Sequence, residues 1–404
     1  MNNRVLIVNK FYYARGGDCV CTLNLEHLLK SQGYDVAIYA MSYPENIDSV
    51  WNNYFATEVS FGGGISDKIA AAKRLLGLGD IQSSFKKLLN DFRPQVVHLQ
   101  NIHSYLSPVL AKLAKEAGCK VVWTLHDYKL LCPSYSCLRD GKPCELCYDD
   151  KSNVLTKRCM KGSFVASALA YLEALKWNRT LLEKYVDNFV CPSAFMAQKM
   201  AQGGFDKSKL TVVCNFVDPV KLESFKNLPT ESRDSYYLYV GRLSEEKGVR
   251  TLMEVASSLP YKLKVAGGGP LADELRDKYA GNDNVEFLGH QDAKQVSELL
   301  SSAVASVIPS ECYENNPLSA IESLCAGTPV IGARIGGIPE LIDSESGVVF
   351  ESGNKAELEN AIREAFARDW DNANIKEKSL ERFSPEKHYD KIKEIYNIDK
   401  CISL

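Results

Sequence analysis

The sequence lacks a marked excess of charge of either sign, and it lacks long apolar runs. Its 404 residues include 48 lysines and arginines against 51 aspartates and glutamates, a formal net charge of −3. This balance gives no electrostatic case for nucleic acid as the main ligand. No apolar run is long enough to cross a bilayer, and the N-terminal stretch MNNRVLIVNKFYY has an apolar core too short for a signal peptide. We therefore expect a cytoplasmic protein.

A framework of disulfides is not expected either, although cysteine is abundant. The 13 cysteines are odd in number and scattered over a long chain without a secretory signal, which favours reduced thiols. Two of them, Cys144 and Cys147, have the C-x-x-C spacing that lets two thiolates reach one tetrahedral zinc. Two more thiols from the same loop, residues 132–159, could complete a structural site. The five candidates are Cys132, Cys137, Cys144, Cys147 and Cys159.

Two other uses of this loop fit the same pattern. The thiols could be small buried side chains, or they could make the loop sensitive to oxidation. A catalytic metal is not expected, because four thiolates leave no open coordination position.

The chain alternates between apolar runs and helical patterns, which predicts an α/β fold with parallel sheets. Residues 4–9, 36–39, 95–100 and 120–125 are compact apolar runs bounded by turn or helix signals. After a connector near residues 212–219 the alternation begins again with the apolar run from Tyr236 to Val240. The length allows two or three domains.

Polar residues directly after these strands are the first candidates for a ligand site, since parallel sheets bind ligands beyond the carboxyl ends of their strands. His126 follows one such strand, and Asn101 and His103 follow another. His98 lies inside a strand, and we expect it in the core. Gly16 and Gly17 precede a helix, where an anion-binding loop and a plain glycine turn fit equally well.

The second half carries two cations at a strand-to-helix turn. Arg242 offers paired donors and Lys247 a compact charge, a combination that suits a diphosphate. The alternative is a capped helix start in which Lys247 pairs with Glu245 or Glu246. Further on, Gly268 lies in a triple glycine that allows close approach of a ligand or forms a tight turn.

Residues 306–343 read as strand, polar loop, helix, strand, glycine loop and helix. Asn316 is the expected cap of the first helix, with Pro317 at its first position. Glu314 then lies in the loop and Glu322 in the second turn of the helix, both directed toward one cleft. Unpaired N–H groups near Ser319 and Ala320, and a second helix start at Gly336 and Gly337, would meet an anion. Two ordinary strand-to-helix units with surface acids are the alternative.

The segment 67–93 predicts a basic helical region with an apolar side. Such a region could rest on an anionic membrane, or it could be a solvated face over the core. Its cations are Lys68, Lys73, Arg74, Lys86, Lys87 and Arg93.

Four stretches, GRLSEEKG, AGGGP, NVEFLGH and PSECYENNPLSAIESLCAGTPVIGARIGGIPELI, resemble the second domain of the family-four retaining glycosyltransferases. The resemblance implies the glycosyltransferase-B fold, in which two Rossmann-like domains face each other across a donor cleft. We expect an acceptor domain at 1–215, a donor domain at 216–380, and a C-terminal helix at 381–404 packing back on the first domain.

The resemblance also implies roles for single residues. Glu322 would bind the ribose hydroxyls, Glu314 would address the donor sugar, and Arg242 with Lys247 would hold the diphosphate. His126 matches a histidine that contacts the donor sugar near the reacting carbon. The other donor-binding positions would be Gly16, Gly17, Gly268, Asn315, Asn316, Pro317 and Leu318. The usual glycine-phenylalanine-glycine stretch is replaced here by Asn315, Asn316 and Pro317, so these residues bear on which sugar is accepted.

The implied activity is metal-independent transfer with retention from a nucleoside-diphosphate sugar, UDP favoured, to a hydroxyl of a glycan or polyprenyl-linked glycan. The cysteine-rich loop resembles a bacterial branch that builds surface polysaccharides, which places the enzyme in the cytoplasm at the inner face of the membrane. A sugar-nucleotide epimerase or hydrolase of the same fold, and a non-catalytic sugar-nucleotide-binding protein, are the alternatives.

Overall fold

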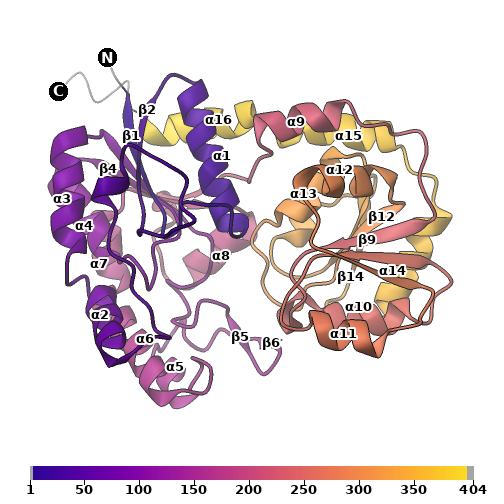
Figure 1. Cartoon of the computed structure of the whole chain (residues 1–404), viewed down its shortest axis with the longest axis horizontal. Coiled ribbons are helices and arrows are strands. Elements are labelled where there is room, and N and C mark those ends of the chain that lie inside the picture. The colour runs from indigo at the N-terminus through magenta and orange to yellow at the C-terminus, as the bar shows by residue number, and fades with distance from the viewer. Residues whose placement is uncertain (1–2, 398–404) are drawn as a thin grey trace. The chain divides into compact units, whose positions relative to one another are not determined.

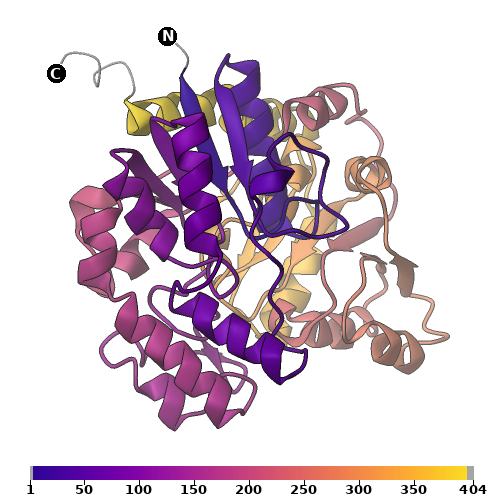
Figure 2. The same ribbon diagram turned by 60° about the vertical axis from the view of Figure 1, so that its left-hand side comes forward.

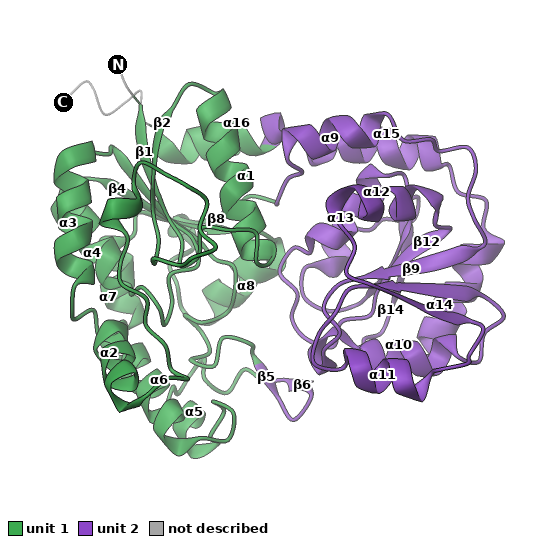
Figure 3. Ribbon diagram, in the orientation of Figure 1, with its two compact units in different colours: residues 1–137, 144–214, 388–404 green, residues 138–143, 215–387 purple. Residues whose placement is uncertain are grey.

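The computed structural model describes residues 3–397 and divides the chain into two compact units (Figures 1 and 3). The first unit holds the chain up to Cys137, residues 144–214, and the C-terminal part from His388 onward. The second unit holds residues 215–387 together with the short segment Leu138–Pro143. Each unit is an α/β fold built on one parallel sheet, so the predicted fold class is confirmed.

The sheet of the first unit has six parallel strands in the order β2-β1-β3-β4-β7-β8. Its inner strands are buried along almost their whole length, as expected for a sheet covered on both faces. The strands are β1 (Arg4–Val8), β2 (Asp35–Tyr39), β3 (Val96–Leu99), β4 (Lys120–Thr124), β7 (Asn188–Cys191) and β8 (Leu210–Val212).

Helices connect the parallel strands of this unit, because a parallel pair needs a crossover. They are α1 (Gly17–Ser31), α2 (Ile65–Leu75), α3 (Ile81–Phe92), α4 (Val109–Glu116), α5 (Asn153–Thr156), α6 (Phe164–Lys176), α7 (Arg179–Tyr185), α8 (Ala194–Gln202) and the last helix, α16 (Pro385–Tyr396). A short antiparallel hairpin, β5 (Leu138–Arg139) with β6 (Lys142–Pro143), interrupts the cysteine-rich loop.

The basic segment 67–93 forms two helices and not one. The chain leaves α2 through Gly77 and Gly79, both at positive φ, before α3 begins. Phe85 and Leu88 of α3 are buried, and Arg74 of α2 is buried in an ion pair with Asp80 at 2.6 Å. The apolar side of α3 therefore belongs to the core. No helix among residues 3–397 is long and apolar enough to span a membrane.

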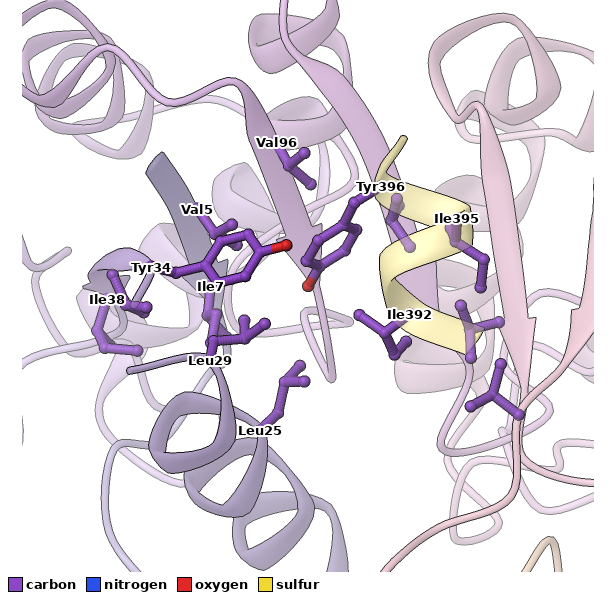
Figure 4. Close-up of a cluster of buried hydrophobic side chains, with 14 of the residues drawn as sticks. Val5, Ile7, Leu25, Leu29, Tyr34, Ile38, Val96, Ile392, Ile395 and Tyr396 are labelled. Carbon is purple, nitrogen blue, oxygen red and sulfur yellow. The ribbon is translucent and has the colours of Figure 1, made fainter. Parts of the chain in front are cut away.

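The end of the chain contributes to the core of the first unit. Ile392, Ile395 and Tyr396 of α16 lie in one buried cluster with Val5 and Ile7 of β1 (Figure 4). The Tyr396 hydroxyl is 2.7 Å from Nδ1 of His98, whose Nε2 lies 2.7 Å from the Thr124 hydroxyl. Histidine 98 is fully buried, as the sequence predicts.

The second unit has six parallel strands in the order β11-β10-β9-β12-β13-β14. Helices α10 and α11 cover one face of this sheet, and α12 and α13 cover the other (Figure 1). The strands are β9 (Tyr236–Val240), β10 (Lys262–Ala266), β11 (Val285–Gly289), β12 (Ala305–Ile308), β13 (Val330–Ala333) and β14 (Gly347–Phe350). The helices are α9 (Pro219–Lys226), α10 (Val249–Ala256), α11 (Ala272–Lys278), α12 (Ala293–Ser302), α13 (Leu318–Cys325), α14 (Lys355–Ala367) and α15 (Asn372–Arg382).

The contribution of α16 to the core leads to a prediction on stability. Ile392→Ala should lower the free energy of unfolding of the first unit by about 2–5 kcal/mol, because it leaves a cavity among buried side chains. The matched control is Ile47→Ala at an exposed position, which should change it by less than about 0.5 kcal/mol. Urea denaturation followed by tryptophan fluorescence measures both. Equal, small losses in the two variants would mean that α16 does not pack there.

The burial of His98 leads to a prediction on pH dependence. Burial lowers the pKa of His98 to about 3, whereas an unfolded histidine titrates near about 6.5. Below about pH 6.5 the unfolded chain therefore takes up a proton that the folded ring refuses, and stability falls with pH by about 1.4 kcal/mol per unit from this residue. The His98→Gln variant should lose that part of the slope between about pH 4 and pH 6. An unchanged slope in urea denaturation would contradict the assignment.

Candidate active site

Both sheets have a place where the strand order reverses, and open α/β sheets bind ligands in the crevice at that place. In the second unit the reversal lies between β9 and β12, which are neighbours in the sheet although two strands separate them in the chain. The loops that leave the carboxyl ends of these two strands begin at Gly241 and Pro309. They carry the predicted residues Arg242, Lys247 and Glu314.

The loop after β9 presents one exposed cation and one engaged cation. The backbone N–H of Gly241 donates to the carbonyl of Ala266 at 3.0 Å, and the Tyr239 hydroxyl donates to the carbonyl of Arg242 at 2.8 Å. The guanidinium of Arg242 is exposed and makes no ion pair within residues 3–397. A backbone held from two sides thus presents a guanidinium that can bind a phosphate.

The second cation joins this loop to the loop after β12. Lys247 Nζ lies 2.5 Å from Glu314 Oε1, and its neighbour Glu246 instead accepts from the Ser244 hydroxyl at 2.7 Å. Glu245 pairs with Arg250 at 2.8 Å. The alternative in which Lys247 pairs with Glu245 or Glu246 is therefore wrong.

The environment of Lys247 keeps its ammonium charged. Burial works against the charge, but the Glu314 carboxylate and its hydrogen bond outweigh burial, so the pKa of Lys247 is raised above its usual value. Glu314 Oε1 also accepts from the Ser310 hydroxyl at 2.7 Å. Glu314 Oε1 thus contacts both the Lys247 ammonium and the Ser310 hydroxyl.

The backbone of Glu314 is held by the glycine loop after β13. The N–H of Gly337 donates to the Glu314 carbonyl at 2.8 Å. A Cβ on Gly336 would lie only 2.1 Å from that carbonyl oxygen, and Gly336 has a φ of 61°. Only glycine allows this approach. The expected second helix after these glycines is a single 3₁₀ turn, Ile338–Glu340.

The polar segment between Glu314 and α13 is anchored to the start of the second unit. Asn316 Oδ1 accepts from the backbone N–H of Asn215 at 3.0 Å, and its carbonyl accepts from the Asn215 amide at 2.9 Å. Asn316 is buried, so its side chain holds this segment in place. The sequence predicted Asn316 as the cap of this helix, and that prediction is wrong. Pro317 takes the cap position, and α13 begins at Leu318.

The start of α13 still offers backbone donors. The N–H of Ala320 donates to the Pro317 carbonyl at 3.1 Å, contrary to the expectation that it is unpaired. The N–H groups of Leu318 and Ser319, in the first turn, have no partner within the helix by its geometry. They point out of the helix start as anion donors do.

Glu322, on α13, has a partner that the sequence did not suggest. Lys221 Nζ lies 2.5 Å from Glu322 Oε1, and both side chains are largely buried. Lys221 lies on α9, whose start is set by Asp218: its carboxylate accepts from the N–H of Val220 at 2.9 Å, and Pro219 follows as the first helical residue. The only signal in the sequence is this cap: Asp218 followed by Pro219 marks the start of the helix that carries Lys221.

Gly268 and Asn315 complete the predicted set in this unit. The Gly268 carbonyl accepts from the N–H of Leu243 at 2.9 Å, and a Cβ on Gly268 would meet open space. The glycine thus supports the turn next to Arg242. Asn315 is half-buried between Glu314 and Asn316.

In the first unit the strand order reverses between β1 and β3, and a second polar cluster lies there. Gly16 is the extended cap residue of α1, and Gly17 begins the helix. Asp18, in the first turn, accepts from the Asn101 amide at 2.7 Å. Burial acts against the charge on Asp18, but His126, Lys10 and Asn101 outweigh it and lower its pKa. Asp18 is not among the site residues expected from the sequence, although it directly follows the glycine pair.

His126 belongs to the same cluster. Its Nε2 lies 2.7 Å from the Gln100 side-chain oxygen. Burial lowers the pKa of His126, against the opposing effects of Asp18 and Asp127. The imidazole is therefore neutral at pH 7. His103, by contrast, is buried against Trp123, with ring centroids 5.1 Å apart.

The zinc site predicted in the cysteine-rich loop stays a prediction. Among residues 3–397, no group of three or more histidine, cysteine, aspartate or glutamate side chains is arranged to hold a metal ion. Cys132, Cys137 and Cys147 are buried thiols, and Cys137 and Cys147 donate to the Cys132 sulfur, which lowers the pKa of Cys132. Cys132 also bonds to the Ser134 hydroxyl at 3.1 Å. The burial and hydrogen bonding of these three thiols fit the alternative of small buried side chains, and zinc ligation by four of the five cysteines is left as a prediction.

Comparison with known proteins agrees with this architecture. A Klebsiella pneumoniae protein described as an uncharacterized 42.6 kDa protein in the cps region is 27% identical over 351 residues, which cover 83% of this chain and 87% of that protein. The structure of sucrose-phosphate synthase from Thermosynechococcus elongatus superposes with a TM-score of 0.69 at 18% identity, covering 100% of both chains. That of Anabaena HepE in complex with UDP and glucose gives 0.64 at 15% identity, covering 97% and 99%. At these identities the two structures show a shared fold.

Family models match both halves of the chain. Residues 220–396, which contain the Arg242, Lys247, Glu314 and Glu322 cluster, match the model for glycosyl transferases group 1. Residues 15–221, which begin just before the glycine pair of α1, match the model for glycosyltransferase family 4. With two parallel-sheet units and paired cations and carboxylates where the strand order reverses, the chain belongs to the family-four glycosyltransferases.

Proposed function

We propose that this glycosyltransferase transfers a sugar, with retention of configuration, from UDP-sugar to a hydroxyl of a glycan or lipid-linked glycan. The observation that supports this best is the Lys247 and Glu314 pair beside the exposed Arg242, at the reversal of strand order in the second unit. The UDP preference is taken from Anabaena HepE, whose structure holds UDP and glucose.

The two cations suit the chemistry of the departing diphosphate. Breaking the bond between the anomeric carbon and the phosphate oxygen leaves negative charge on that oxygen, and donors already in place stabilise it without reorganising. Arg242 would bind two phosphate oxygens through its fork, and Lys247 would add a compact charge. The raised pKa of Lys247 keeps it charged while the reaction proceeds.

The two carboxylates, Glu322 and Glu314, would each contact a different part of the donor beyond the diphosphate. Glu322 would accept hydrogen bonds from the two ribose hydroxyls, and Lys221 holds it in place at 2.5 Å. Glu314 would contact the sugar, since its carboxylate lies next to the cation that binds the diphosphate. Asn315 would lie beside the same sugar, whereas Asn316 is committed to Asn215 and acts on the position of the segment.

Retention needs no covalent intermediate with the enzyme. The acceptor oxygen forms its bond to the anomeric carbon on the face that the phosphate leaves, and its proton passes to the departing phosphate oxygen. The protein supplies position and charge for this exchange. His126, Gly16 and Gly17 are predicted to reach the donor from the first unit, and this remains a prediction from the family resemblance.

The biological setting is proposed from the relatives. The Klebsiella protein lies in a cps region, and the cysteine-rich loop resembles enzymes of surface-polysaccharide synthesis. We therefore assign the acceptor to that class and the reaction to the cytoplasmic face of the membrane. A UDP-sugar epimerase or hydrolase would instead convert the donor without an acceptor, and a non-catalytic binding protein would leave it intact. Incubation with UDP-sugars alone detects an epimerase or hydrolase, and addition of the glycan acceptor then separates a transferase, which consumes the donor, from a binding protein, which does not.

The first prediction concerns nucleotide binding. Lys247→Ala and Glu322→Ala should each weaken UDP binding by roughly tenfold or more, because each removes a charged hydrogen-bonding partner worth about 1.5–3 kcal/mol. Isothermal titration calorimetry measures the affinity. The control is Lys294→Ala, an exposed lysine of α12 with an 85% exposed side chain, which should leave the affinity unchanged. Native UDP affinity in both site variants would refute the donor site.

A second prediction separates the carboxylates. Glu314→Gln keeps the size of the side chain and should lower the transfer rate by roughly a hundredfold, as for the loss of one transition-state contact. Its UDP affinity should stay within a few-fold of the native value, because the sugar and not the nucleotide loses a partner. Transfer is followed with radiolabelled UDP-sugar and extracted bacterial glycolipid. A loss confined to UDP affinity, with normal turnover at saturation, would contradict the assigned role.

A further inference from the structure

Helix α6 exposes apolar side chains in a way that the fold of the first unit does not explain. Its sequence, FVASALAYLEALK, is apolar around most of its circumference. Phe164 is 56% exposed and Val165 is 69% exposed, and Leu172 and Leu175 are about half exposed about two and three turns further on. A surface helix normally directs polar side chains to water, so this stripe indicates a surface that is covered in use.

Helix α2 extends the same surface. It lies beside α6 at one end of the first unit in both views (Figures 1 and 2). The two helices are fastened at their C-terminal ends, where the Trp177 indole N–H donates to the carbonyl of Leu75 at 2.9 Å. Ile65 of α2 is 80% exposed and Ile69 is 51% exposed. We call the exposed apolar side chains of α2 and α6 the docking face.

The charges around the docking face are mostly positive. The one acid in the sequence of α6, Glu173, is buried and pairs with Lys129 at 3.0 Å. Asp67 on α2 accepts from the N–H of Gly64 at 2.9 Å and so caps that helix. Two more acids, Asp149 and Asp150, are exposed ahead of α5. Against these stand the exposed cations Lys68, Lys73, Lys157, Arg158, Lys161 and Lys176.

We propose that the docking face binds the surface of an anionic phospholipid bilayer. Apolar side chains flanked by lysine and arginine are the pattern of helices that lie in the headgroup region, where burial of apolar area and attraction to anionic lipids add. A protein partner would instead be expected to meet aromatic anchors and few lysines. This surface shares α2 with the segment predicted from the sequence. It differs in its second helix, because α3 has its apolar side in the core and α6 lies beside α2 instead.

Vesicle binding is independent of the proposed transfer reaction, so the two can fail separately. The full-length enzyme is sedimented with vesicles of phosphatidylcholine alone and with vesicles of phosphatidylcholine mixed with phosphatidylglycerol. The native protein should bind the mixed vesicles and lose binding at high salt. The double variants Phe164→Ser/Val165→Ser and Lys157→Glu/Arg158→Glu should each reduce the partition coefficient roughly tenfold or more.

Matched controls keep the test specific. Val50→Ser changes an 83% exposed valine elsewhere on the first unit, and Lys294→Glu reverses an exposed charge on the second unit; both should bind as the native protein does. Circular dichroism checks that every variant is folded. Equal binding by native protein and docking-face variants would overturn the proposal. So would a dimer in analytical ultracentrifugation that the Phe164→Ser/Val165→Ser variant dissociates, because the face would then be an interface between copies of the chain.

Discussion

The ion pair between Lys247 and Glu314 joins the two loops on which the chemistry of this chain depends. The strands that carry these loops, β9 and β12, are neighbours only because the sheet order reverses between them. The two charges neutralise each other, with exposed side-chain fractions of 32% for Lys247 and 14% for Glu314. Under the proposed function, a diphosphate would compete with Glu314 for the lysine because it carries more negative charge, and Ser310 would still donate to the glutamate. The pair thus holds the two loops together and, in the proposed function, would also bind the ligand.

The backbone around the Lys247 and Glu314 pair is held by close backbone contacts at two glycines, where a Cβ atom would collide with a carbonyl oxygen. Gly336 lets the loop after β13 lie against the Glu314 carbonyl, and Gly248 lies equally close to the carbonyl of Pro309, which a Cβ would approach to 1.9 Å. Both glycines have positive φ. The loops are therefore held by backbone contacts on both sides, and charged side chains can be presented without a large entropic loss on binding.

Much of this was accessible from the sequence, for identifiable reasons. Strands of a covered parallel sheet are continuous apolar runs, so their ends, and the polar residues after them such as Lys247, Glu314 and His126, could be located by reading along the chain. Contacts between segments that are distant in the sequence could not be predicted in this way. Lys221 of α9 meets Glu322 of α13 although the two helices are far apart in the sequence, and no local pattern encodes that. The break between α2 and α3 and the burial of the cysteine thiols likewise depend on what packs against them, which spacing alone does not report.

The central claim is that the diphosphate of the donor binds to the cations at the reversal of strand order in the second unit. A crystal structure of the enzyme with UDP tests it most directly. The account predicts phosphate oxygens within hydrogen-bonding distance of Arg242 and Lys247 and the ribose hydroxyls at the Glu322 carboxylate. UDP bound elsewhere, with Lys247 still paired only to Glu314, would contradict it.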